Sequence, residues 1–425
     1  MPITSDIIRH CLTDKREEIL AAQIVPRRLD VDDQLNYVFV GVRQTGKTYM
    51  LYQRVHQLLE QGIGWDEILY VNFEDERLTE VTSDDLNRFL EVHLETYGKR
   101  PYIFLDEIQN IPHWEKFARR LADAKYRLYI TGSNAKMLSK DVATTLGGRF
   151  VIRDVYPYSF EEYLRARDVE IGQDWQFSTE QCSTIKRNYN KYIHDGAMPA
   201  FATVNQSREA LSSLYQKIYL GDIAARHGLK NERALALLIK KLAESVKNPV
   251  SYQRLRHSVV STGNNTSLPT IIDYVQYATD SWLVLPMENE LSSFTTRESQ
   301  KKYYFIDCGL LNLFLINPET SLLENLVAIQ LMRRYGRDQV RFYRNSHEID
   351  FVVPDSQLAV QVSYSLLEPG TEEREIKPLQ HFGATHPGWQ LLVITHEEER
   401  LLDNGKSHIE ILPAWKWLLT ESKSK

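Results

Sequence analysis

The chain has few cysteines and no long apolar run. Only Cys11, Cys182 and Cys308 occur among 425 residues, far apart and without a C-x-x-C pair. This spacing favours neither a zinc site nor a disulfide framework, so a reducing compartment is expected. No stretch of about eighteen apolar residues occurs that could span a membrane, and the N-terminal segment lacks the apolar part of a signal peptide. We therefore expect a cytoplasmic protein that does not enter a membrane.

An excess of positive charge is also missing. The formal net charge of −6 excludes a protein whose whole surface is basic, although it allows local basic patches. The share of hydrophobic and charged residues, 43% and 25%, is typical of a globular protein. Because 425 residues exceed what one ordinary core accommodates, we expect two or three domains.

Residues 41–48, Gly-Val-Arg-Gln-Thr-Gly-Lys-Thr, match the phosphate-loop pattern G-x-x-x-x-G-K-[ST]. An apolar stretch at 36–40 predicts a buried strand before the loop, and apolar residues at helical spacing over 49–61 predict a helix after it. Lys47 would place its charge at the β- and γ-phosphates, and Thr48 would offer its hydroxyl to Mg²⁺. This context disfavours a chance match in a glycine turn. The expected nucleotide-binding residues of the loop are Gly41, Gln44, Thr45, Gly46, Lys47 and Thr48.

A second apolar stretch, 101–107, ends in two adjacent carboxylates, Asp106 and Glu107. A buried strand rarely ends in two acids unless a cation or a mechanism uses them. Asp106 would complete the Mg²⁺ shell with Thr48, and Glu107 would polarise the attacking water. The structural alternative is a solvated strand end.

A third strand is expected at 126–134. Because parallel strands bring their C-terminal ends to one edge, Ser133 or Asn134 would lie near the γ-phosphate and orient the water. The stretch Met137 to Leu146 predicts a helix that two glycines end. Arg149 follows, and it is a candidate arginine finger for a neighbouring subunit, which implies a homo-oligomer. Alternatively, Arg149 is an ordinary surface residue.

The order of these parts resembles the AAA+ type P-loop ATPases of prokaryotes that carry a C-terminal DUF4143 domain. This resemblance implies an α/β fold with a P-loop parallel sheet, ATP and Mg²⁺ as cofactors, and Asp106 and Glu107 as the Walker B pair. It also places Asn134 near the sensor position, with Ser133 or Thr131 as alternatives. The resemblance rests on the stretches 24–28 (Ile-Val-Pro-Arg-Arg), 72–78 (Asn-Phe-Glu-Asp-Glu-Arg-Leu), 105–109 (Leu-Asp-Glu-Ile-Gln), 146–149 (Leu-Gly-Gly-Arg), 156–160 (Tyr-Pro-Tyr-Ser-Phe), 302–310 (Lys-Tyr-Tyr-Phe-Ile-Asp-Cys-Gly-Leu) and 323–326 (Leu-Glu-Asn-Leu).

The middle of the chain is helical and locally basic. Residues 226–257 hold eight Lys or Arg against two Glu, so positive charge is concentrated there. Ser267 is a candidate N-cap, with Pro269 in the first turn of a helix that runs to about residue 279. Helix, glycine turn, helix and strand is the outline of a winged helix, which the resemblance also implies. Arg254, Arg256 and His257 would contact double-stranded DNA, unless the segment is a protein-contact module.

Carboxylates near the C-terminus suggest a second site. A hairpin turn at 354–357 would pair Val353 with Leu358, and counting back places Asp350 opposite Gln361. With Glu324 on a preceding helix, the set looks like a PD-(D/E)xK nuclease fold. The expected fourth residue is lysine, but Ser363 stands there. We therefore expect a fold that does not cleave. The alternative sources of positive charge are Lys377 and Arg374, on a helix over 372–381.

These patterns give one main hypothesis and two alternatives. The expected domains are a P-loop ATPase domain (1–157), a helical and winged-helix domain (158–294) and a small α/β nuclease-like domain (295–425). The main hypothesis is an ATPase that couples turnover to the binding or remodelling of nucleic acid. The alternatives are an ATP-gated protein-interaction switch and an ATP-dependent metal nuclease.

Overall fold

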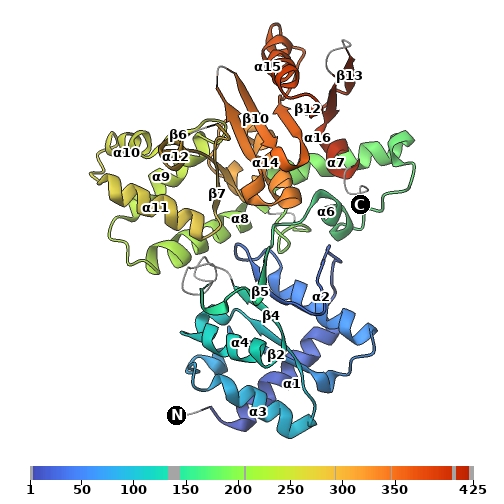
Figure 1. Cartoon of the computed structure of the whole chain (residues 1–425), viewed down its shortest axis with the longest axis vertical. Coiled ribbons are helices and arrows are strands. Elements are labelled where there is room, and N and C mark those ends of the chain that lie inside the picture. Colours follow the sequence, from blue (N-terminus) through green and yellow to red (C-terminus); the bar gives the residue numbers. More distant parts are fainter. Residues whose placement is uncertain are drawn as a thin grey trace. The chain divides into compact units, whose positions relative to one another are not determined.

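The computed structural model describes residues 3–132, 144–204, 207–291, 293–345, 347–403 and 408–420. It divides into two compact units, residues 1–156 and 157–425 (Figure 1). The expected domain limit at 157/158 lies next to this division, and the expected limit at 294/295 falls inside the second unit. Ser133, Asn134 and most of the expected helix over 137–146 lie outside the described residues. Among the described helices, none combines the length and apolar character that crossing a membrane requires.

The first unit is built on a five-stranded parallel sheet with the order β2-β3-β4-β1-β5. Four of its helices are α1 (Ser5–Ala21), α2 (Lys47–Glu60), α3 (Leu86–Tyr97) and α4 (Trp114–Asp123). The α/β parallel-sheet fold that the sequence predicts is thereby confirmed. The strands are β1 (Asn36–Val40), β2 (Ile68–Asn72), β3 (Tyr102–Asp106), β4 (Arg127–Gly132) and β5 (Phe150–Asp154).

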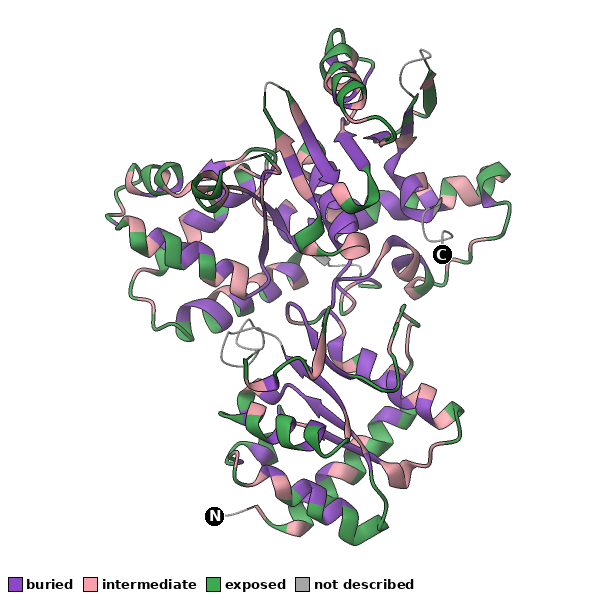
Figure 2. Ribbon diagram, in the orientation of Figure 1, coloured by how far each residue is buried: buried purple, intermediate pink, exposed green. Residues whose placement is uncertain are grey.

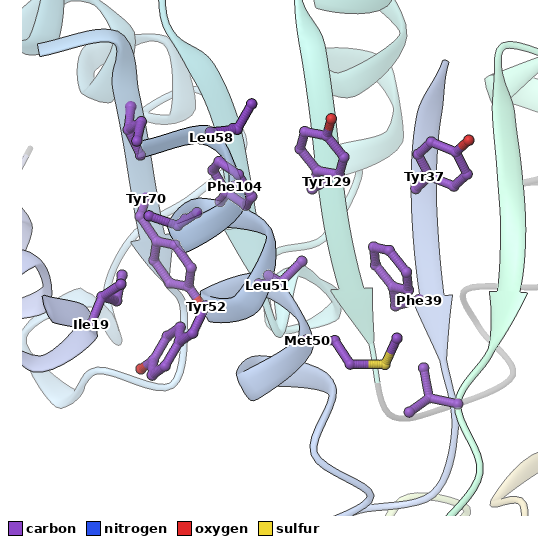
Figure 3. Packing of buried hydrophobic residues seen from close by; sticks show 13 residues of the cluster. Ile19, Tyr37, Phe39, Met50, Leu51, Tyr52, Leu58, Tyr70, Phe104 and Tyr129 are labelled. Carbon is purple, nitrogen blue, oxygen red and sulfur yellow. The ribbon is translucent and has the colours of Figure 1, made fainter. Parts of the chain in front are cut away.

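One face of this sheet is a row of aromatic rings. Tyr37, Tyr129 and Phe104 stand on three neighbouring strands, and their ring centroids are 6.1 Å and 4.9 Å apart. Helix α2 crosses this face and packs Leu51 and Met50 against the rings (Figure 3). Burial of such side chains contributes about 1.5–3 kcal/mol each. This packing fixes the N-terminus of α2 at the edge where β1 ends.

The same edge collects the other expected site residues. Strands β1, β3 and β4 run parallel and end at Val40, Asp106 and Gly132. Their C-terminal ends therefore meet at one edge, which is where ligands bind in open α/β sheets. The phosphate loop, the acidic pair and Thr131 are brought together in this way.

The second unit opens with helices. Ser159 caps the first of them in a reciprocal capping box with Glu162. A segment of π-helix over residues 217–225 continues the third helix. The helices are α6 (Phe160–Ala166), α7 (Thr179–Asp195) and α8 (Ser207–Gln216).

The next elements surround a small antiparallel sheet with the order β6-β8-β7. The side chain of Ser267 accepts a hydrogen bond from the N–H of Thr270, so it caps α11 as expected. The expected limit at 294/295 separates β7 from β8, which pair with each other. The elements are α9 (Glu232–Glu244), β6 (Val250–Ser251), α10 (Tyr252–Val260), α11 (Leu268–Asp280), β7 (Val284–Met287), α12 (Phe294–Ser299) and β8 (Gln300–Phe305).

A six-stranded mixed sheet with the order β13-β14-β12-β11-β10-β9 forms the last part. The hairpin has the expected register, with Val353 opposite Leu358. The central strands β10, β11 and β12 and the helix α14 are largely buried, whereas β13 is largely exposed (Figure 2). The elements are α13 (Cys308–Asn312), α14 (Glu319–Tyr335), β9 (Arg341–Arg344), β10 (Glu348–Val353), β11 (Leu358–Val362), α15 (Thr371–Thr385), β12 (Gln390–Thr395), β13 (Arg400–Asp403), β14 (His408–Pro413) and α16 (Ala414–Thr420).

Candidate functional site

Two glycines allow the phosphate loop to take its shape. A Cβ on Gly41 would lie 2.3 Å from the carbonyl oxygen of Val155, so no other residue fits there. Gly46 has a φ of 85°, in the left-handed region that favours glycine. It precedes α2, and no side chain of the described residues caps that helix. The first N–H groups of α2 are thus available to an anion, as phosphate loops require.

Lys47 links the loop to the acidic pair. Its Nζ donates to the carbonyl oxygens of Gly41 and Val42, at 3.2 and 3.1 Å, and lies 3.6 Å from Oε1 of Glu107. The side chain is only 3% exposed. The ammonium therefore lies inside the loop, where phosphate oxygens would replace these carbonyls as its partners.

Thr48 and Asp106 are in direct contact. The hydroxyl of Thr48 donates to Oδ1 of Asp106 at 3.2 Å. Thr131 also donates to Oδ1, and the hydroxyl of Tyr70 donates to Oδ2 at 2.9 Å. Burial raises the pKa of Asp106 to about 6, while the bond from Thr131 acts in the opposite direction. A hydroxyl beside a carboxylate is a set of hard oxygen donors, so these residues fit Mg²⁺.

Glu107 follows in a strained position. Its φ is 52°, which is uncommon for a residue other than glycine and is typical of functional sites. Its N–H donates to the hydroxyl of Thr131 at 2.9 Å, and its Oε2 accepts a hydrogen bond from Gln109. Thr131 thus contacts both members of the acidic pair. Sequence reasoning named Thr131 only as an alternative for the sensor position, and it missed Tyr70 and Gln109.

Arg149 lies at the end of the sheet where the strands begin, opposite the end that carries the phosphate loop. Its neighbour Phe150 pairs with Asn36 at the start of β1, whereas the loop follows the end of β1. Five strand residues separate these points, which is roughly 16 Å at about 3.3 Å per residue. The guanidinium forms an ion pair with Asp123. Arg149 therefore does not reach the phosphate loop of its own chain, and its action on a neighbouring subunit stays a prediction.

The second unit gathers the carboxylates expected near the C-terminus around a lysine that sequence reasoning missed. Nζ of Lys302, on β8, lies 3.3 Å from Glu324, 3.1 Å from Glu348 and 3.5 Å from Asp350. The Lys302 side chain is 0% exposed. Burial alone would lower its pKa, but the carboxylates outweigh burial and raise it. The available signal was a lysine directly before the apolar and aromatic stretch 303–306, two residues from Tyr304 and hence on the same face of the strand, because buried lysines are almost always paired.

Of the other residues expected in the nuclease-like set, Gln361 contacts this cluster. The side chain of Gln361 accepts from the N–H of Asp350 and donates to Glu375. The hydroxyl of Ser363 donates to the carbonyl of Ser365. Lys377 and Arg374, the expected alternative cations, instead pair with Glu373 and Glu375 and are 65% and 70% exposed. The described residues contain no group of three or more His, Cys, Asp or Glu arranged to hold a metal ion.

Family models match two parts of the chain. Residues 34–164 match the model described as "AAA domain", and residues 186–321 match "Domain of unknown function (DUF8612)". The second match corrects the name DUF4143 that the resemblance implied. It includes the stretch 302–310 but ends before Glu324, Asp350, Gln361 and Ser363. With the parallel sheet and the loop geometry, the first match defines an AAA-type P-loop ATPase.

A relative that spans the whole length shows the family. The chain is 31% identical to the uncharacterized protein MJ1544 of Methanocaldococcus jannaschii, over 97% of this chain and 95% of the relative. The chain belongs to the same family as MJ1544. It is also 29% identical to an uncharacterized protein of Haemophilus influenzae, over 90% of this chain and 94% of the relative.

Solved structures show more distant similarity. The Walker-type ATPase PABY2304 of Pyrococcus abyssi is 12% identical with a TM-score of 0.40, over 74% of this chain and 96% of that chain. The Aeropyrum pernix ORC1 protein in complex with DNA is 14% identical with a TM-score of 0.30, over 76% of this chain and 93% of that chain.

Proposed function

We propose that the first unit hydrolyses ATP with Mg²⁺ and that the second unit couples this turnover to nucleic acid. The observation that carries the hydrolytic part is the contact of Thr48 with Asp106, with Glu107 and Lys47 beside it. The oxygens of Thr48 and Asp106 for a cation, the carboxylate of Glu107 for water and the ammonium of Lys47 for phosphate thus lie within a few ångströms of one another.

Each of these groups has one task. The loop N–H groups and Lys47 bind the phosphates, and Thr48 with Asp106 hold Mg²⁺. Bound Mg²⁺ neutralises charge that develops on the phosphate oxygens. Glu107 accepts a proton from the attacking water or orients it, and Gln109 and the N–H bond to Thr131 hold Glu107 in place.

ATP turnover by the purified chain tests this part. Phosphate release is expected in Mg²⁺ and is expected to stop when EDTA removes the cation. Lys47→Ala is expected to weaken both nucleotide binding and turnover, because the phosphate charge loses its partner. Turnover that persists in Lys47→Ala would show that the activity comes from another site or from a contaminant.

Exposed basic side chains support the nucleic-acid part. Arg233 and Lys240 on α9 and Arg254 and His257 on α10 are exposed. Arg256 is exposed as well, but it donates through Nε to the carbonyl of Thr266 at 3.0 Å, and that contact holds it against the loop before α11. We therefore assign the phosphate contacts of the proposed winged helix to Arg254 rather than to Arg256.

Salt dependence of DNA retention tests this coupling. Retention of double-stranded DNA is expected to fall steeply between about 50 and 200 mM salt, with a slope set by the number of phosphate contacts. Arg254→Gln is expected to reduce that slope by about one. ATP turnover measured with and without single- and double-stranded DNA completes the test. The coupling would be contradicted if DNA did not change the rate of ATP turnover and if the protein showed no salt-dependent retention of DNA.

One observation favours the alternative of an ATP-gated protein switch. Helix α11, the third helix of the proposed winged helix, contains Asp273 and Asp280 but no Lys or Arg. In the helix-turn-helix arrangement this position enters the major groove, where carboxylates are repelled by phosphate. A chain that ignores DNA while it hydrolyses ATP would support the switch.

We also propose that the carboxylate cluster of the second unit does not cleave DNA. The sequence supports this through Ser363, which stands where a lysine is expected, whereas the ammonium at this cluster comes from Lys302 on another strand. Lys302 contacts the carboxylates that a divalent ion would need, and Glu324 and Asp350 are only 6% and 11% exposed. Supercoiled and linear DNA incubated with Mg²⁺ or Mn²⁺ should stay intact. Cleavage that disappears in Asp350→Ala would overturn this proposal.

A further inference from the structure

The stretch 24–28 precedes the first strand and has no part in the chemistry described above. The first of its two arginines, Arg27, is half-buried and contacts the backbone of the phosphate loop. Nη1 donates to the carbonyl oxygen of Thr45 and Nη2 to that of Tyr156, both at 2.8 Å. Tyr156 is the last residue of the first unit. One guanidinium thus joins the loop to the segment through which the chain leaves the ATPase unit.

The backbone of Arg27 is fixed as firmly as its side chain. Its N–H donates to Oε1 of Gln53 at 2.9 Å, and Nε2 of Gln53 donates back to its carbonyl at 2.7 Å. Gln53 lies on α2, the helix that starts at the loop. The side chain of Gln53 therefore holds both the N–H and the carbonyl of Arg27. This fixes the position of the Arg27 backbone, from which the guanidinium extends, relative to the loop.

The bond to Thr45 acts on a phosphate donor. In a planar trans peptide the carbonyl and the following N–H point in opposite directions. The Thr45 carbonyl faces Arg27, so the N–H of Gly46 is aimed away from Arg27. A charge-assisted hydrogen bond to the carbonyl also polarises the peptide and makes that N–H a better donor.

A second contact connects the same two segments. The carbonyl of Val155 occupies the space that a Cβ on Gly41 would need, at 2.3 Å. The N–H of Val155 donates to the carbonyl of Val40 at 2.7 Å, directly before the loop. The exit segment, Val155–Tyr156, therefore contacts the first glycine of the loop and, through Arg27, its fifth residue.

We propose that Arg27 is a positioning residue that aims the Gly46 N–H at phosphate and couples the phosphate loop to the exit segment. A phosphate that moves the loop then changes the hydrogen bonds of residues 155–156, the last residues before the second unit. This inference rests on the proposed ATP binding by the first unit. It goes beyond that function by naming Arg27 as the residue through which nucleotide binding affects the exit segment.

The experiment compares Arg27→Gln and Arg27→Lys with Arg28→Gln. Arg28 is the matched control, because it is the adjacent arginine but its side chain is 78% exposed and pairs with Asp30. Steady-state turnover gives KM and kcat. Hydrogen exchange of the peptide covering residues 150–160, with and without Mg-ADP, reports the exit segment.

For Arg27→Gln we expect KM to rise about tenfold, the effect of one lost charge-assisted hydrogen bond, with a much smaller change in kcat. We also expect the nucleotide-dependent change in exchange to disappear. Arg27→Lys keeps the charge, but its ammonium reaches only one of the two carbonyls at a time. Its KM should therefore lie between that of the parent and that of Arg27→Gln. Arg28→Gln should behave like the parent. A merely structural defect would instead lower the amount of active protein, and hence kcat, at constant KM.

The outcomes separate this inference from the proposed function. If the parent binds no nucleotide, the proposed function fails and the inference with it. If the parent binds nucleotide and Arg27→Gln keeps the parental KM and exchange response, the inference alone fails. If Arg27→Gln does not fold, Arg27→Lys decides: a parental KM and exchange response in that variant overturns the inference.

Discussion

At the scale of single residues, the oxygens of Asp106 are already divided among hydroxyl donors. Thr48 and Thr131 donate to one oxygen and Tyr70 to the other. Because Thr131 also accepts from the N–H of Glu107, the two carboxylates are held in a fixed relation. The different roles of the acids follow from this: Asp106 is enclosed by donors, while Glu107 contacts only Lys47 and Gln109 among the described contacts of its carboxylate.

Glu107→Gln is expected to separate binding from chemistry. The amide keeps the size of the side chain but is a far weaker proton acceptor, so turnover should fall by about 10²-fold or more. Nucleotide affinity should change little, because the phosphates are held by the loop and Lys47. Single-turnover phosphate release and fluorescent-nucleotide binding measure the two quantities. Parental turnover in this variant would refute the assignment of Glu107.

Lys302→Met is expected to destabilise the second unit strongly. Removal of the ammonium leaves Glu324 and Asp350 buried without their cation, and breaking a buried ion pair costs about 3–5 kcal/mol. The control is Lys377→Met, because Lys377 and its partner Glu373 are both 65% exposed, so its cost should stay within about 1 kcal/mol. Urea unfolding followed by circular dichroism measures both.

The pH dependence of that loss has a definite sign. Burial and the charge of Glu324 raise the pKa of Asp350 to about 7, and Lys302 opposes this rise. Without Lys302 the carboxyl holds its proton to still higher pH. The folded variant then binds more protons than the unfolded chain, so its stability increases as pH falls. The deficit of Lys302→Met should therefore be largest near pH 8 and smaller near pH 5. An equal deficit at both values would contradict this account of the cluster.

At the scale of elements, local patterns predicted most of the structure that positions the sites. The hairpin turn at 354–357 predicted the register of Val353 with Leu358, and the Ser267 cap predicted the start of α11, because both depend on residues close in the chain. The contact of Lys302 with Asp350 was not predictable in this way. It requires β8 to lie beside α14 and β10, which is decided by packing between segments distant in sequence. Tyr70 was missed for the same reason, since its partner Asp106 is on another strand.

Ser267→Ala tests the contribution of one cap. The side chain accepts the N–H of Thr270 at the start of α11, and loss of an N-cap costs about 0.5–2 kcal/mol. If α11 is part of the contact surface for a partner, fraying should also weaken that contact, whereas ATP turnover without a partner should stay parental. Thermal unfolding and turnover measure these effects. Unchanged stability would mean that water replaces the serine at no cost.

At the scale of the whole molecule, the position of Arg149 excludes action on its own phosphate loop, so an arginine finger at this position would have to act between chains. The arginine lies at the edge opposite its own phosphate loop, and its ion pair with Asp123 holds it on the surface of the first unit. An arginine finger stabilises charge on the transferred phosphoryl group and is worth about 10³–10⁵ in turnover where it operates. A neighbour's loop would have to lie against this edge in an oligomer.

Mixing experiments test this arrangement directly. Arg149→Ala is expected to lose most turnover while it keeps nucleotide affinity, and Lys47→Ala is expected to lose both. A mixture of the two should regain part of the activity, because some interfaces then combine an intact loop with an intact arginine. Arg153→Ala, on the strand β5 that follows Arg149, is the control and should not complement Lys47→Ala beyond its own activity. Light scattering on the same samples gives the oligomeric state. Full activity of Arg149→Ala in a monomer would exclude the finger, since a single chain cannot bring this edge to its own site.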